Sequence, residues 1–238
     1  MKQLLCVLIL FISVTNVNAQ WKKIKGNKNL ITATREISYF QEIKSKGSFK
    51  VILTDGKQGE IEITAEENLM EYIITEVTDN KLSIHYKKGK NIQPRKEIII
   101  KVPIKFINHL TLSGSGEIIS EVPIENKEFS IVVTGSGDIS LEEVESKNIT
   151  ATLSGSGNLD IAGETNKLKV RISGSADFEG KKLESDKVDI TISGSGNATV
   201  YANNSLKARV SGSGDIYYKG NPKNIDVKSS GSGNAQKL

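Results

Sequence analysis

A six-residue phrase that recurs seven times constrains this chain more than any other feature of its sequence. Most copies consist of an apolar residue, a serine, Gly-Ser-Gly, and an acidic or amide residue, as in Leu112–Glu117 and Ile192–Asn197. The first glycines of the copies are Gly114, Gly135, Gly155, Gly174, Gly194, Gly212 and Gly231. Their nearly constant period of about 20 residues is typical of a solenoid, in which each repeat stacks on the one before it.

Apolar and polar residues alternate on both sides of the phrase. Around Gly194, apolar residues occupy alternate positions from Val188 to Ile192 and return on the same parity at Ala198 and Val200. A period of two indicates strands rather than helices. A unit of this length cannot bury its own apolar face, whereas stacked units can.

We therefore predict an all-β fold, a right-handed parallel β-helix of the pectin-lyase-like type. It should have about 20 residues per coil in the C-terminal half and three short sides per coil. An antiparallel sandwich is disfavoured because turns of the Asn-Gly type are scarce in that half. A propeller is disfavoured because each blade needs about 40 residues.

The N-terminus resembles an export signal. Lys2 is followed by the short apolar run Leu4–Val14 and by small residues at Val17–Ala19, and the only cysteine of the chain, Cys6, lies within the run. The alternative is a short N-terminal membrane anchor. No later stretch approaches the roughly 18 apolar residues of a membrane span. We predict an exported protein of the periplasm, the outer-membrane surface or the extracellular space, with no transmembrane segment after signal cleavage.

The domain organisation follows from these patterns. We predict a signal peptide at residues 1–19, a flexible lysine-rich lead-in at 20–34 and one β-helix domain at 35–238. Within the domain, irregular coils should occupy 35–110 and the seven repeats 111–238. A single helical turn is expected at Glu66–Tyr72.

Stacking of the repeats predicts files of identical side chains. Two outward serine files are candidates for ligand contact: Ser113, Ser115, Ser136, Ser154, Ser156, Ser173, Ser175, Ser193, Ser195, Ser211 and Ser213. A structural polar ladder should follow them: Glu117, Asp138, Asn158, Asp177, Asn197, Asp215 and Asn234. Carboxylate and amide alternate after the first two, and an amide can donate to the carboxylate beside it. The glycines should either face inward at a narrow bend or adopt positive φ at a corner.

The phrase and the segments before it resemble the bacterial family called putative auto-transporter adhesin, head GIN domain. The resemblance covers about Ile31 to Leu238 and rests, besides the repeats, on Arg35–Phe40, Gly47–Leu53, Glu67–Tyr72, Thr75–Val77 and Lys81–Ile84. It implies a pectin-lyase-like right-handed β-helix in an exported protein of the Bacteroidota, with a role in cell adhesion and no agreed catalytic residues. The seventh copy departs from the pattern at Ser229 and Ala235, which implies a looser or capping C-terminal coil.

Residue patterns that would indicate catalysis or a cofactor are missing from the sequence. His85 and His109 stand alone, no serine lies in a strand-to-helix elbow, and no glycine-rich loop precedes a helix. The Asp/Asn ladder offers oxygen atoms to calcium, but the calcium-binding nonapeptide of β-rolls is absent. We therefore predict no enzyme, no catalytic residues, no cofactor and no metal.

The favoured function is that of a non-enzymatic adhesin-like binding or scaffold protein of the cell envelope, whose stacked face contacts glycan or protein. A polysaccharide lyase or hydrolase on the same fold is the alternative, and an ice-binding protein ranks lower. The lysine-rich loop also offers envelope-contact candidates: Lys87, Lys88, Lys90, Arg95 and Lys96. Because the net charge is only +4 and the charges are interleaved, nucleic acid is not an expected partner. The oligomeric state is open.

Overall fold

The structure is a computed structural model that describes residues 23–238, so the signal peptide predicted at 1–19 lies outside the described residues. The N-terminal strands are β1 (Lys23–Lys25), β2 (Leu30–Glu36), β3 (Glu42–Gly47), β4 (Phe49–Thr54), β5 (Glu60–Glu66), β6 (Ile73–Thr78), β7 (Lys81–Tyr86), β8 (Asn91–Gln93) and β9 (Ile98–Pro103). The repeat half contains β10 (His109–Gly114), β11 (Glu117–Ser120), β12 (Ile124–Gly135), β13 (Asp138–Gly155), β14 (Leu159–Gly174), β15 (Phe178–Gly194), β16 (Ala198–Gly212), β17 (Ile216–Lys219), β18 (Asn224–Gly231) and β19 (Ala235–Lys237). A 3-10 helix, η1 (Glu67–Tyr72), follows β5 where the helical turn was expected. Within residues 23–238, the structure has no helix of the length and hydrophobicity needed to cross a membrane.

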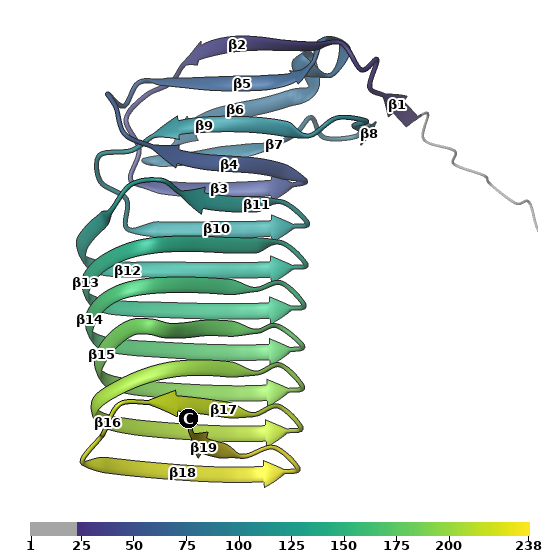
Figure 1. Cartoon of the computed structure of the whole chain (residues 1–238). Coiled ribbons are helices and arrows are strands. Elements are labelled where there is room, and N and C mark those ends of the chain that lie inside the picture. The colour runs from purple at the N-terminus through teal and green to yellow at the C-terminus, as the bar shows by residue number, and fades with distance from the viewer. Residues whose placement is uncertain (1–22) are drawn as a thin grey trace, which may run out of the picture.

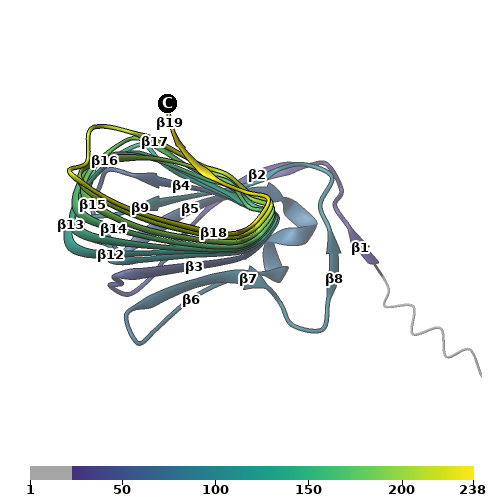
Figure 2. The same cartoon turned by 90° about the horizontal axis from the view of Figure 1, so that it is seen from below.

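The repeat half is a parallel β-solenoid of about six turns, which confirms the predicted fold class (Figure 1). Each corner glycine pairs in register with the corner glycine of the next rung, from Gly114 to Gly231. Seen from the N-terminal end, the chain turns clockwise as it recedes, so the coil is right-handed (Figures 1 and 2).

The shape of one coil differs from the expected three short sides. Each of β13 to β16 is a continuous strand of 15 to 18 residues that runs from just after one glycine corner to the next. Each strand bends once, at the edge opposite the glycine corner (Figure 2). The bend is marked by shifts in register, as between Leu141 and Val144. Because a bulge can bend a strand without ending it, no separate third side is needed.

The apolar positions of the repeats form files in the core. Val188, Ile190 and Ile192 are at most 3% exposed, as the alternation predicts. Phe178 stacks on Ala198 of the next rung, so a large and a small side chain share one file. Burial of one such aliphatic side chain contributes about 1.5–3 kcal/mol, which makes the files the main source of stability.

The two glycines of the phrase have different structural roles. The first adopts positive φ at the corner and the second faces inward, so both expected roles occur. The first glycine has positive φ in every copy, for example +137° at Gly194, and forms the corner. The second glycine is buried, and a Cβ on Gly196 would lie 1.9 Å from the carbonyl oxygen of Ala176. The corner therefore uses glycine once for its conformation and, except in the fourth copy with Ala176, once for close approach of two rungs.

The N-terminal segment continues the solenoid and then closes it. β3 and β4 pair in parallel with β10 and β11, so they form the first coil. Above them β2, β5 and β9 pair antiparallel, as do β6 and β7, so this part does not repeat the parallel coil.

The expectation of a flexible lead-in at residues 20–34 is wrong for its described part. β1 pairs in parallel with β8, and β2 pairs antiparallel with β5. The connecting backbone is fixed because the N–H of Lys28 donates to the carboxylate of Glu66 over 2.6 Å. Lysine content alone suggested a loose segment, whereas this long-range pairing orders it.

Candidate functional site

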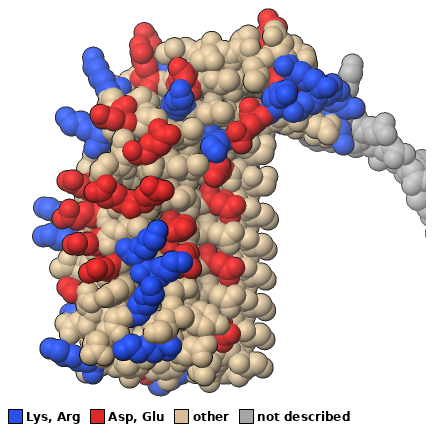
Figure 3. All heavy atoms as spheres, viewed as in Figure 1, with Lys and Arg blue, Asp and Glu red and all other residues tan. Residues whose placement is uncertain are grey.

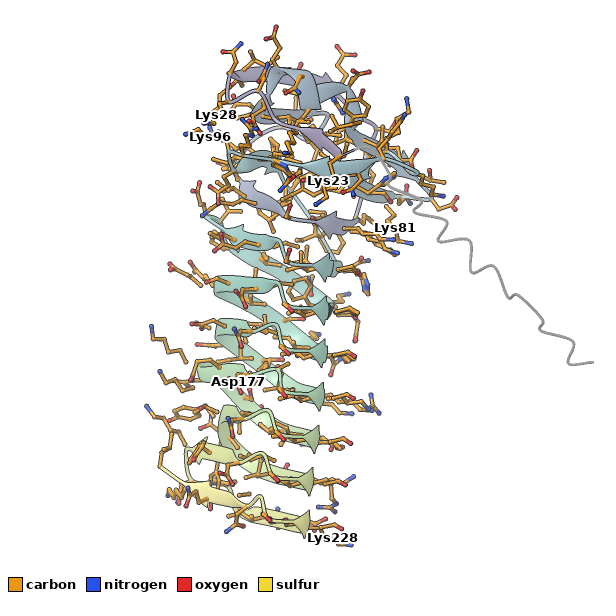
Figure 4. All side chains as sticks on the ribbon, turned by 90° about the vertical axis from the view of Figure 1, so that its right-hand side faces the viewer. Lys23, Lys28, Lys81, Lys96, Asp177 and Lys228 are labelled. Atoms are coloured by element: carbon orange, nitrogen blue, oxygen red, sulfur yellow. The ribbon has the colours of Figure 1, made fainter. Side chains whose placement is uncertain are left out.

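The glycine corners place two serine files along one edge of the solenoid. We name the outward residues before and after each corner glycine, from Ser113 to Ser232, the serine ridge. The backbone N–H of the serine after each corner glycine, from Ser136 to Ser232, donates to the corner-glycine carbonyl of the rung before over 2.8 to 2.9 Å. The ridge residues are exposed apart from the half-buried Ser113. The rungs therefore repeat with nearly constant geometry along one edge, which faces the viewer in Figure 4.

The ridge hydroxyl groups point outward without hydrogen-bond partners in the described part of the chain. From Ser113 to Ser232 no ridge hydroxyl is bonded to another protein group within the described residues, although the backbone N–H groups behind them donate to carbonyl oxygens of the rung before. A serine hydroxyl offers one donor and two acceptor positions. The ridge is thus a row of uncharged hydrogen-bonding groups at the spacing of stacked strands, about 4.8 Å.

The polar ladder lies directly beside the ridge, with Asp177 labelled in Figure 4. Asn158 donates to the carboxylate of Asp138 through its backbone N–H at 2.9 Å and its side-chain amide at 2.8 Å. Asn197 makes the same two contacts with Asp177, at 2.7 and 3.3 Å. These bonds hold the turn that follows the corner, and in each pair both of them end on the Oδ1 atom of the aspartate.

The structure adds a rung to the ridge that the repeat pattern missed. Gly47 pairs with Gly114 in register and has φ +141°. Lys46 therefore stands in one serine file, and Lys50 stands at the head of the polar ladder, 3.0 Å from Glu117. That hydrogen bond to Glu117 raises the pKa of Lys50. The Gly-Ser pair at 47–48 was the available signal, but it lies far before the first full copy and lacks the second glycine.

A lysine-lined hollow opens at the N-terminal end of the ridge. We name it the basic hollow, with a volume of about 490 Å³. Its cationic side chains are Lys44, Lys46, Lys87, Lys88 and Lys90. All five are exposed, and within the described part of the chain none lies in an ion pair. Uncompensated lysines around a concavity favour an anionic ligand.

The uncharged groups of the basic hollow are held in place. The ring of Tyr86 packs on Phe49 with 4.5 Å between centroids, and its hydroxyl lies 3.2 Å from that of Ser48. Burial raises the pKa of Tyr86, so its hydroxyl stays protonated and able to donate. His85 contacts Glu76, a carboxylate that also lines the hollow, at 3.2 Å.

The structure separates the five envelope-contact candidates into two groups. Lys87, Lys88 and Lys90 line the basic hollow together with the lysines of β3. The backbone N–H groups of Arg95 and Lys96 instead donate to Glu66 at the far end of β8. Figure 4 shows Lys96 beside Lys28, on the side of the molecule opposite Lys81. Figure 3 shows lysine and arginine gathered where β1 and β8 project from the solenoid.

The two histidines lie apart from each other, and each has a local partner. His109 contacts Thr111 through Nε2 at 2.9 Å, and burial lowers its pKa. His85 lies on β7 and its partner Glu76 lies on β6. The β6–β7 hairpin, which turns at Asp79-Asn80, brings the two side chains together. In residues 23–238 there is no group of three or more histidine, cysteine or acidic side chains suited to hold a metal ion.

A second periodic file was not found from the sequence. Glu125, Glu145, Glu164 and Glu184 pair in register at the bend opposite the ridge and line a groove of about 920 Å³. The residue after each glutamate is Asn, Ser, Thr and Ser in turn, and Ser146, Thr165 and Ser185 are buried. The sequence does contain a signal for this glutamate file, because the glutamates recur at the same period as the serine phrase. In-register like charges are destabilising, so this edge tolerates along its whole length a cost that the polar ladder has only between Glu117 and Asp138.

Comparison with known proteins agrees with this architecture. The family model described as "Putative auto-transporter adhesin, head GIN domain" matches residues 39–222. No match to a curated protein was found.

Several crystal structures of bacterial proteins share the fold. A putative adhesin from Bacteroides fragilis is 22% identical, with a TM-score of 0.84 over 90% of this chain and 100% of its own. A putative lipid binding protein from Parabacteroides distasonis is 28% identical, with a TM-score of 0.76 over 91% and 100%. A putative adhesin from Parabacteroides merdae is 23% identical, with a TM-score of 0.71 over 91% and 99%.

Proposed function

Since the chain belongs to the putative auto-transporter adhesin, head GIN domain family, we propose that it is a non-enzymatic binding protein of the bacterial cell envelope. The proposal includes export through the predicted signal peptide at residues 1–19. Within it, the serine ridge binds an envelope glycan, and the basic hollow receives an anionic group of the same polymer. The observation that carries the proposal is the continuity of these two surfaces, since Lys46 of the hollow is also a rung of the ridge.

The chemistry of the two surfaces suits an extended, repeating ligand. A row of free hydroxyls at constant spacing can bond successive hydroxyls of a polysaccharide, each contact being worth about 0.5–1.5 kcal/mol. Lysines at one end add attraction for carboxylate or phosphate groups and fix the direction in which the polymer lies. Weak contacts repeated along a polymer sum to useful affinity without a deep pocket.

Removal of ridge hydroxyls tests the glycan contact. Replacement of Ser154, Ser156, Ser173 and Ser175 by alanine should weaken binding to a glycan-array hit at least tenfold, at about 0.5–1.5 kcal/mol for each lost bond. The fold should be unchanged, because these side chains are exposed and unbonded. The control is alanine at Thr152 and Thr191, half-buried hydroxyl residues in one outward file away from the ridge. Equal binding by both variants, or no binding to any glycan by the wild type, would refute the ridge as the contact surface.

A second candidate function is lipid binding, favoured by the neighbour described as a putative lipid binding protein and by the basic hollow. In this case the hollow would hold an anionic headgroup. Vesicles of anionic and of zwitterionic phospholipid separate this function from glycan binding. Capture by anionic vesicles alone, with no glycan-array signal, would favour the lipid.

Charge reversal tests the basic hollow under either ligand. Lys46→Glu with Lys88→Glu should weaken capture by the anionic ligand at least tenfold and reduce the salt dependence of the remaining binding, because surface charges act over about 10 Å at 0.1 M salt. Lys182→Glu with Lys187→Glu makes the same change in net charge on exposed lysines elsewhere on the coil. If both double variants lose binding equally, overall charge rather than the hollow is responsible.

A further inference from the structure

The last rung of the solenoid leaves its core file open. Ile225 and Val227 continue the buried files of Leu206 and Ala208, yet they are 50% and 36% exposed. Every residue of β18 is exposed, and within residues 23–238 this strand pairs only with β16 (Figure 1). An edge strand of this length with inward apolar side chains is a ready template for another strand.

The opposite end of the solenoid is closed in a different way. There β2 lies across the end antiparallel to β5, with Arg35 on its partly buried side. The Arg35 guanidinium donates to the carbonyl oxygens of Ile73 and Met70 at 2.6 and 2.8 Å. A charged side chain that points inward protects an edge strand from pairing. β18 has no inward charged side chain, although Lys237 of β19 continues the file of Tyr218 at the same end. The edge strands at the two ends are therefore protected differently.

The outward charges of β18 select the partner and its direction. Asp226 and Lys228 flank Val227, with opposite signs, and Asp226 is also paired with Arg209 of the rung before. If a second copy of β18 pairs antiparallel with Val227 opposite Val227, Asp226 of each copy lies opposite Lys228 of the other. Opposite charges in such cross-strand pairs are stabilising. A parallel, in-register copy would instead place like charges opposite each other.

We propose that the protein forms a two-fold symmetric dimer by end-to-end antiparallel pairing of β18, which covers Ile225 and Val227. The same patch serves both copies, so the contact is isologous and closes at two chains. The two serine ridges then lie on opposite edges of a doubled solenoid. This inference rests on the C-terminal rung alone and does not depend on the ligand of the ridge.

The test is the mass of the purified protein in solution, measured by light scattering and by sedimentation over a range of concentrations. The wild type should be a dimer. Lys228→Asp should raise the dimer dissociation constant by about tenfold or more, because two attractive pairs become repulsive. An equimolar mixture of Lys228→Asp and Asp226→Lys should dimerise again, since the two variants are complementary.

The matched control is Arg171→Asp, in the same outward file as Lys228 but within the middle of the coil, between Thr152 and Thr191. It should leave the dimer intact, and circular dichroism of each variant checks that it is folded. A monomeric wild type, larger or open-ended assemblies, or a dimer that tolerates Lys228→Asp would each overturn the proposal.

Discussion

Gly194→Ala should destabilise the solenoid by about 3 kcal/mol or more, because overpacking strain and an unfavourable φ add together. A Cβ at this position would lie 2.2 Å from the carbonyl oxygen of Gly174, and the residue has φ +137°. The atom in the way belongs to the backbone of the previous rung, so no side chain can move aside. In thermal unfolding the midpoint should fall by about 6–12 °C for a chain of this length.

Gly59→Ala is the control for this prediction. Gly59 has a similar φ of +130°, but no atom lies within 4 Å of the position of its Cβ. It therefore reports the conformational cost alone, and the difference between the two variants isolates the contact between rungs. If both alanines lower the midpoint equally, the close stacking of the corners is not what requires glycine at Gly194.

Glu66→Gln should loosen the N-terminal closure by about 2 kcal/mol, the scale of a hydrogen bond to a charged group. The Glu66 side chain is fully buried and accepts backbone N–H groups of Lys28 at 2.6 Å, Arg95 at 2.8 Å and Lys96 at 3.3 Å. A glutamine amide would turn a donor toward donors. Hydrogen exchange in β1, β2 and β8 should accelerate, while the repeat half should keep its protection.

The same carboxylate predicts how stability depends on pH. Burial alone would raise the pKa of Glu66, but the backbone donors from Arg95, Lys28 and Lys96 outweigh it and lower the pKa below its ordinary value of 4.5. A carboxylate whose pKa is lower in the folded than in the unfolded chain stabilises the fold at pH values above its unfolded pKa. This stabilisation is lost as the pH falls through its folded pKa. The wild type should therefore lose stability in acid below about pH 4.5, and the loss should be smaller in Glu66→Gln.

Glu67→Gln is the control for both measurements. Glu67 is exposed, and its side chain accepts one hydrogen bond, from Asn29 at 2.9 Å. Its replacement should leave exchange and acid sensitivity nearly unchanged. An unaltered acid profile in Glu66→Gln would show that other carboxylates control the acid response.

Some features of the candidate site followed from residue spacing, and others did not. The serine files could be predicted because successive rungs have the same sequence pattern. When such rungs stack in parallel, only one register aligns their equivalent residues. The basic hollow could not be predicted, because it joins Lys44 and Lys46 to Lys87 and Lys88. These two pairs lie far apart in the sequence, outside the repeats, and they meet only through the β3–β7 pairing.

The sequence by itself determined the coil. A period of about 20 residues, combined with alternation at a period of two, can bury its apolar side chains only by stacking in register, so the files of serine, glycine and core residues were already implied. Only the tertiary structure decided how the coil is terminated. At one end Gly47 adds a rung and Glu66 fixes the preceding strands, while at the other Ile225 and Val227 are left uncovered. The physical reason is that a repeat specifies contacts between neighbouring rungs, whereas the ends depend on contacts between unlike segments, for which no periodicity sets the register.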